Sequence, residues 1–175
     1  ASALEFLHNH KIIHRNLSPA NIMLDSNLYP YLADFYYAKQ TEIKYHYILK
    51  DATPGFMPPE FLRDFMSNQN SFEIDVYAFG MTMFILVAQL NPFINMNQDN
   101  IIQNVKNGFM PQFHKNIGKN WKDLILKCLD QNPKKRPSFK EIRSLLESDI
   151  FVNDTINVKA FNRYKDIFIK FKSNI

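Results

Sequence analysis

The chain has 175 residues, 46% of them hydrophobic, and a formal net charge of +4. This length and composition predict one globular domain with a substantial buried core. The positive charge lies after residue 114, but its lysines are dispersed along helical patterns, which favours a solvated face and does not predict nucleic-acid binding. The single cysteine, Cys128, excludes an intrachain disulfide and is typical of a reducing compartment, so we expect a cytoplasmic location.

The first part of the chain predicts a helix, a loop and a short β-hairpin. Residues 1–10 have the apolar spacing of the end of a helix, and residues 12–21 are expected to form a loop. Residues 22–24 and 28–33 flank an Asp-Ser-Asn turn and predict two antiparallel strands, the second marked as an edge by Pro30. Because the chain begins with Ala1 inside a helical pattern, we expect it to be a fragment of a longer protein.

The following residues predict helices, so the fold is expected to be mainly α. Helical patterns occupy residues 58–64, 72–89, 98–107 and 119–131, and Ser138 with Glu141 forms a capping box that opens another helix. The apolar run at 76–88 is too short to span a bilayer and predicts a helix buried on all sides. Cys128 lies on the apolar face of its helix and is expected to be a buried, inert thiol.

An aromatic pattern after residue 148 predicts one more helix. Its apolar residues recur at helical spacing: Phe161, Tyr164, Ile167, Phe168 and Phe171. We interpret this segment as a helix that packs on the rest of the chain or on an absent domain. A helix that binds a membrane surface or a protein partner is the alternative, and the pattern is compatible with both.

The chemically informative stretch runs from His14 to Asn21 and reads His-Arg-Asn-Leu-Ser-Pro-Ala-Asn. Asp34 and Phe35 follow the predicted hairpin. Because the two strands of a hairpin lie side by side, the amide of Asn21 and the carboxylate of Asp34 are expected to come together. Oxygen ligands of these kinds bind Mg²⁺. The sequence therefore predicts a magnesium and phosphate site.

This stretch resembles the catalytic loop and the metal-binding turn of the protein-kinase family, which read His-Arg-Asp-Leu-x-x-x-Asn and Asp-Phe-Gly. Three positions depart from the family pattern. Asn16 replaces the catalytic Asp, and a neutral carboxamide is a very poor base. Ser18 replaces a Lys, which removes a cation from the transferred phosphoryl group. Tyr36 replaces Gly, so we expect it to forbid permissive backbone angles and to place a ring beside the nucleotide cleft.

The resemblance continues in family order along the chain. Residues 53–60 resemble the end of the activation segment, and Asp75 resembles the aspartate that holds the catalytic-loop backbone. Arg136 resembles the arginine that pairs with Glu60 in a buried ion pair. The resemblance thus gives structural roles to six residues: His14, Arg15, Phe35, Glu60, Asp75 and Arg136.

The resemblance covers residues 1–147 and implies the C-terminal lobe of a protein-kinase-like fold, with the hairpin at the cleft and the N-lobe absent. Residues 148–175 are expected to be a helical C-terminal extension. The turn at 108–111 and the segment ending in Arg136-Pro137 are most similar to the tyrosine-kinase-like group of Ser/Thr kinases. ATP and Mg²⁺ are the implied cofactors, with Met23 under the base and with Asn21 and Asp34 on the metal.

The departures predict a pseudokinase that serves as a regulatory or scaffolding module. An active Ser/Thr kinase, completed by its N-lobe, is the first alternative, because phosphoryl transfer depends mostly on positioning and charge neutralisation. The second alternative is a truncated product that does not fold stably alone. The expected partners are the missing N-lobe and other proteins, and membrane contact of the tail stays open.

Overall fold

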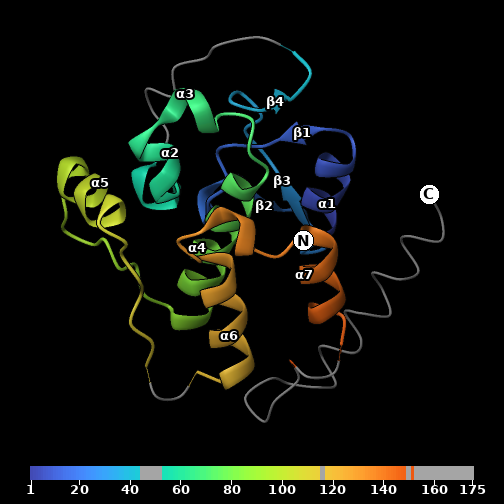
Figure 1. Cartoon of the computed structure of the whole chain (residues 1–175). Coiled ribbons are helices and arrows are strands. Elements are labelled where there is room, and N and C mark those ends of the chain that lie inside the picture. Colours follow the sequence, from blue (N-terminus) through green and yellow to red (C-terminus); the bar gives the residue numbers. More distant parts are fainter. Residues whose placement is uncertain (44–52, 115–116, 149–150, 152–175) are drawn as a thin grey trace.

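The structure is a computed structural model that describes residues 1–43, 53–114, 117–148 and 151 (Figure 1). Its helices in this part are α1 (Ser2–Asn9), α2 (Pro59–Arg63), α3 (Phe65–Asn68), α4 (Glu73–Ala88), α5 (Gln98–Lys106), α6 (Lys119–Cys128) and α7 (Phe139–Leu146). Its strands are β1 (Ile12–Ile13), β2 (Ile22–Leu24), β3 (Pro30–Leu32) and β4 (Lys39–Gln40). Three 3₁₀ turns cover Pro19–Asn21, Pro54–Phe56 and Pro133–Lys135. The described chain is mainly helical, as the sequence predicted.

Helix α4 lies at the centre of the core, where the apolar run at 76–88 predicted a helix buried on all sides; Leu86 near its end is exposed, so the burial is not complete. Ten of its 16 residues are buried, and the hydroxyl of Thr82 is satisfied by the Ala78 carbonyl at 2.8 Å. Helix α6 packs directly against it (Figure 1). Gly80 permits this contact, because a Cβ atom there would lie 2.8 Å from Cβ of Cys128. Burial also raises the pKa of the Cys128 thiol to about 12, which makes the thiol inert at neutral pH.

Helices α1 and α7 pack side by side (Figure 1). The predicted capping box opens α7: the Ser138 hydroxyl accepts from the Glu141 amide, and the Glu141 carboxylate accepts from the Ser138 amide. Across the two helices, the Arg143 guanidinium bonds the carboxylate of Glu5. Helix α7 is thus stabilised both by a local capping box and by an ion pair with the distant helix α1.

Two antiparallel strand pairs lie beside the helices. The predicted hairpin pairs Ile22 with Leu32 and Leu24 with Pro30, and its turn is closed by Asp25, whose carboxylate accepts two backbone N–H groups. Its second strand is shorter than the predicted 28–33, because Leu28 has a left-handed φ of 65° and belongs to the turn. The pairing of β1 with β4 was not predicted, since two-residue strands carry no periodic signal.

The helix bounds otherwise agree closely with the predicted ranges. Helix α6 ends at Cys128 rather than at residue 131, and α3 was missed because it spans only four residues. The helix predicted within 148–175 lies outside the described residues, apart from Ser148 and Phe151. Phe151 is buried against Trp121, with ring centroids 4.9 Å apart. No helix among the described residues is long and apolar enough to cross a membrane.

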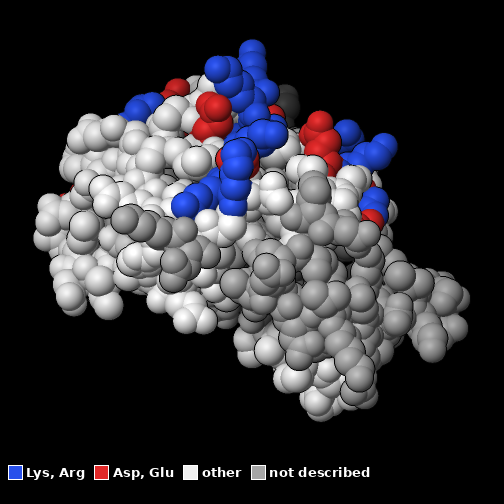
Figure 2. All heavy atoms as spheres, turned by 90° about the horizontal axis from the view of Figure 1, so that it is seen from below, with Lys and Arg blue, Asp and Glu red and all other residues white. Residues whose placement is uncertain are grey.

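Lys and Arg side chains gather near one edge of the face seen from below, with Asp and Glu among them (Figure 2). Several basic groups of the C-terminal helices have acidic partners. Lys119 bonds Asp123, and Arg143 bonds both Glu5 and Glu147. This mixture of signs agrees with the solvated face that the dispersed lysines predicted.

Candidate active site

The loop that follows β1 is held by the side chain of Asp75, at the start of α4. The Asp75 side chain is fully buried, and its two oxygens accept the backbone N–H groups of His14 and Arg15, each at 2.8 Å. His8 contacts the same carboxylate at 2.9 Å. Arg15 has a left-handed φ of 62°, which is uncommon for a residue with a side chain. The role that the sequence predicted for Asp75 is thus matched by its contacts, whereas His8 was missed.

His14 and Phe35 connect this loop to the segment after the hairpin. The His14 ring is fully buried, and its Nε2 lies 3.0 Å from the Ala33 carbonyl oxygen. A carbonyl only accepts, so Nε2 carries the proton, and Nδ1 is free to accept from the Asn16 amide at 3.3 Å. The Phe35 ring packs against the imidazole at 4.9 Å. Both residues therefore orient neighbouring groups.

Asn16, Asn21 and Asp34 come together where the loop after β1 meets the segment after the hairpin, as the hairpin predicted for the last two. The Nδ2 atom of Asn21 donates to the backbone oxygen of Asn16 at 2.7 Å. The Nδ2 atom of Asn16 donates to Oδ2 of Asp34, also at 2.7 Å. Asp34 has a φ of 57°, so a second left-handed residue lies at the site. Such conformations cost energy and concentrate at functional sites.

The donor set fits a hard divalent cation. Because Asn21 uses its Nδ2 on the backbone, its Oδ1 is the atom that remains to bind a ligand. Among the described residues, Oδ1 of Asp34 has only a long contact, 3.4 Å from the Tyr36 amide. An amide oxygen and a carboxylate oxygen suit Mg²⁺. The described residues contain no cluster of three or more His, Cys, Asp or Glu that could hold a metal ion by itself, so this fit depends on the asparagine.

Met23, Ser18 and Tyr36 have different environments. The Met23 side chain is 45% exposed on the hairpin and is not part of the core, so it is free to contact a ligand. Ser18 is buried and supplies no cation. Tyr36 does not have a positive φ, so the turn forms without the permissive angles of glycine. Its ring is 74% exposed and packs edge-on against Tyr37, with ring centroids 5.0 Å apart.

Arg15 and Lys39 form a pair of buried cations that the sequence analysis did not predict. Nε of Arg15 donates to the Tyr37 carbonyl at 2.6 Å, while its two terminal nitrogens have no hydrogen-bond partner among the described residues. Nζ of Lys39 donates to the side chain of Gln69 at 3.1 Å. Burial lowers the pKa of both groups, and the positive charge of Arg15 lowers that of Lys39 further.

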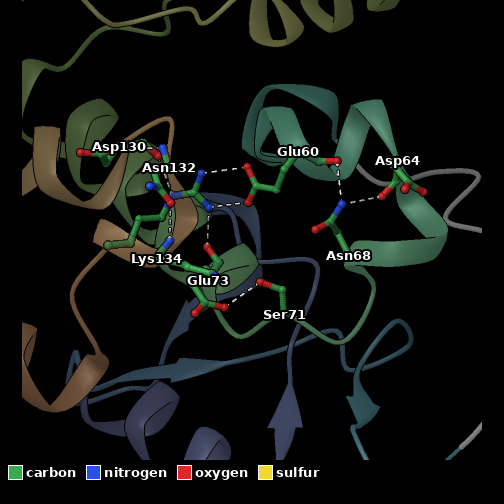
Figure 3. Close-up of polar contacts among 9 residues, drawn as sticks. Glu60, Asp64, Asn68, Ser71, Glu73, Asp130, Asn132 and Lys134 are labelled. Carbon is green, nitrogen blue, oxygen red and sulfur yellow. Dashed lines mark hydrogen bonds and ion pairs between the residues drawn. The ribbon is translucent and has the colours of Figure 1, made fainter.

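The ion pair predicted between Glu60 and Arg136 is present and lies between α2 and the turn before α7 (Figure 3). Two guanidinium nitrogens donate to the two carboxylate oxygens at 2.6 and 2.9 Å. Further bonds run to the carbonyls of Glu73 at 3.1 Å and Asp130 at 2.9 Å. The guanidinium also lies 5.1 Å from the centre of the Tyr77 ring. Every nitrogen of this arginine therefore has an acceptor.

Comparison with known proteins agrees with this geometry. The protein kinase domain family matches residues 1–147, which is most of the chain. The chain therefore belongs to the protein kinase domain family. Its relatives are Ser/Thr kinases, and such kinases in general use ATP and Mg²⁺.

Three relatives illustrate the range of proteins that this chain is similar to. The human ankyrin repeat and protein kinase domain-containing protein 1 is 33% identical over 165 residues, covering 86% of this chain and 21% of that protein. Two proteins of Dictyostelium discoideum are each 30% identical. One, named "Probable LIM domain-containing serine/threonine-protein kinase", matches 91% of this chain and 16% of its own length. The other, RGS domain-containing serine/threonine-protein kinase A, matches 86% and 13%. The chain thus spans about a fifth or less of these relatives.

Proposed function

We propose that this chain is the C-terminal lobe of a catalytically impaired protein kinase that acts as a regulatory or scaffolding module. The observation that carries this proposal is the side chain at the position of the catalytic base. Asn16 presents an amide that donates a hydrogen bond to Asp34, where a base would have to accept the proton of a substrate hydroxyl. A carboxamide has no useful basicity, so the substrate hydroxyl would keep its proton.

The assignment to a lobe is supported by the apolar surface of the hairpin. Met23 and Tyr31 lie directly opposite each other in the strand pairing and are 45% and 50% exposed, and Leu24 and Leu28 of the same hairpin are exposed as well. A single exposed apolar residue is ordinary, but a cross-strand pair of large apolar side chains indicates a surface that another element covers. We propose that an N-terminal lobe of the full-length protein covers this hairpin and completes the nucleotide cleft.

In this proposal the cleft retains the residues that bind the cation and lacks the carboxylate that would act as general base. Asn21 and Asp34 would hold the metal, and Met23 would contact the base of the nucleotide. Mg²⁺, when bound, supplies charge neutralisation on the phosphate oxygens. Ser18 adds no positive charge there, and Tyr36 brings a ring to the metal side of the cleft. The residues thus favour nucleotide binding over phosphoryl transfer.

The test of impaired catalysis is restoration of the base. We expect Asn16→Asp, in a protein that includes the N-terminal lobe, to raise phosphoryl transfer from MgATP by at least about tenfold, the usual value of a positioned general base. The double variant Asn16→Asp with Asp34→Asn should lose this gain. Peptide phosphorylation by the unchanged protein at the rate of an ordinary kinase would overturn the pseudokinase proposal.

Nucleotide affinity tests the cleft separately. The 175-residue chain offers only one wall, so we expect it to bind MgATP no tighter than about 1 mM, near 4 kcal/mol. With the N-terminal lobe present, Asn21 and Asp34 should support binding at about 1 μM, near 8 kcal/mol. Calorimetric titration of both proteins measures this. Micromolar binding to the single chain would show that the phosphates lie elsewhere, and no binding to the complete protein would leave only surface contacts as its function.

An active Ser/Thr kinase is the second candidate, and the proximity of Asn21, Asn16 and Asp34 favours it, because positioning and charge neutralisation carry most of phosphoryl transfer. A truncated product that is unstable alone is a third, and a cooperative thermal transition of the isolated chain would exclude it. The remaining proposals are membership of the tyrosine-kinase-like group, protein partners, a cytoplasmic location and a tail that packs on the protein.

A further inference from the structure

The bond between Asn16 and Asp34 places a hydrogen-bond donor on a cation ligand. Nδ2 of Asn16 lies 2.7 Å from Oδ2 of Asp34, and this contact is exposed to solvent. The opposite orientation of the amide would set its carbonyl oxygen against the carboxylate, and two acceptors at this distance repel. The amide therefore donates, and its positive end lies against an oxygen that a cation would also use.

This arrangement sets two positive groups in competition for one carboxylate. A charge-assisted bond to an ionised acceptor is about twice as strong as a neutral one, so Asp34 is partly neutralised before any cation arrives. Within the described ranges, its other oxygen has only the 3.4 Å contact with the Tyr36 amide. The amide of Asn16 occupies one of the acceptor sites of the carboxylate, and a cation at any of the others would meet a weakened negative charge.

We infer that Asn16 is a positioning residue that competes with the divalent cation for Asp34 and so lowers cation affinity at the cleft. The inference rests on the proposed function, because it takes Asn21 and Asp34 as the cation ligands. The replaced base would then impair the site twice, by the absence of a proton acceptor and by a donor on the metal ligand. Removal of the amide should strengthen cation binding even without a new charge.

Asn16→Ala is the variant that isolates this effect. It deletes the donor, adds no carboxylate, and keeps the backbone oxygen that accepts from Asn21. We expect Mn²⁺, titrated into the ¹⁵N-labelled chain without nucleotide, to broaden the backbone resonances around Asn21 and Asp34. The dissociation constant should fall at least threefold or so in Asn16→Ala, a modest value because the bond is exposed. Asn100→Ala, the same change on an exposed asparagine of α5, should leave it unchanged.

A second readout follows the amide itself. Saturation with diamagnetic Mg²⁺ should move the side-chain NH₂ resonances of Asn16 as the bond to Asp34 breaks. Asp34→Asn should abolish the broadening, which shows that the probe reports on this site. Unchanged or weaker Mn²⁺ binding in Asn16→Ala, with Asp34→Asn still losing it, would overturn this inference alone. Equal binding by the unchanged chain and Asp34→Asn would overturn the cation site of the proposed function as well.

Discussion

Two regions of this molecule use charged and amide side chains in opposite ways. One region, which we call the framework, comprises Asp75 and Arg136 with their partners. Both side chains are buried, and each of their polar atoms has a partner. At the proposed cation site, Asn16 and Asp34 are joined by one exposed bond, and Asp34 has a left-handed backbone. The first region keeps one geometry, because breaking its bonds would leave a buried charge without a partner. The second can exchange its partners for a ligand.

Arg15 lies at the boundary between these regions and shares features of both. Its backbone N–H is fixed by Asp75, whereas its two terminal guanidinium nitrogens are buried without a partner in the described part of the chain. Lys39 beside it is buried with a neutral partner, Gln69. The fully paired framework offsets the cost of these unpaired groups, so its removal should have the larger effect on stability.

The largest effect is expected from Arg136→Ala. It should lower the free energy of unfolding by about 3 kcal/mol or more, because Glu60 would be left buried without its partner. Arg136→Lys should rescue only part of this loss, since lysine lacks the planar fork. The matched control is Arg143→Ala, whose side chain is 28% exposed and whose loss should be about 1 kcal/mol or less. Equal urea midpoints for the two alanine variants would contradict the comparison.

A somewhat smaller effect is expected from Asp75→Asn. The carboxylate accepts on both oxygens, and a carboxamide can accept on only one, so one backbone N–H of the loop would lose its acceptor. We expect a loss of about 2 kcal/mol, measured by chemical denaturation. Asp64→Asn at the exposed cap of α3 is the same change where water can replace a lost acceptor, and it should be nearly neutral. If both variants unfolded together, Asp75 would not hold the loop.

Lys39→Met should act in the opposite direction. Burial next to Arg15 lowers the pKa of Lys39 from its usual 10.5, so the folded state disfavours the charged form. Removal of this charge should raise stability at pH 7 by roughly 1 kcal/mol. The exposed Lys127→Met is the control and should change it by less than about 0.5 kcal/mol.

The stability gain of Lys39→Met should depend on pH, and the direction of this dependence follows from the lowered pKa of Lys39. The unfolded chain holds the Lys39 proton up to higher pH than the folded chain, so the stability of the unchanged protein rises with pH in this window. The advantage of Lys39→Met should therefore shrink as the pH approaches 10.5. Thermal melts of both proteins between pH 7 and pH 10 measure it, and an advantage that grew with pH would contradict the assignment.

The smallest stability effect is expected from Asn16→Ala, within about 0.5 kcal/mol of the unchanged chain. Its bond to Asp34 is exposed, and water can replace the lost partner. The same variant should change cation binding, so function and stability separate at this residue. A loss above about 2 kcal/mol in a denaturation curve would place Asn16 in the framework instead.

Much of this architecture could be predicted from local signals. The apolar run of α4, the capping box at Ser138 and Glu141, and the amphipathic spacing of α6 each determine a helix within a few residues. The Asp-Ser-Asn turn determined the hairpin and so the meeting of Asn21 with Asp34. These patterns are readable because the interactions behind them lie within one or two turns of the chain.

The tertiary structure alone decided the contacts that join distant segments. The pairing of β1 with β4, the approach of His8 to Asp75 and the burial of Lys39 depend on groups far apart in sequence. The sequence determined that Asn16 cannot be a base, since that follows from the chemistry of a carboxamide. That its amide lies on Asp34 was decided by the fold, because a hydrogen bond needs two atoms within about 3 Å, and only packing brings residues 16 and 34 to that distance.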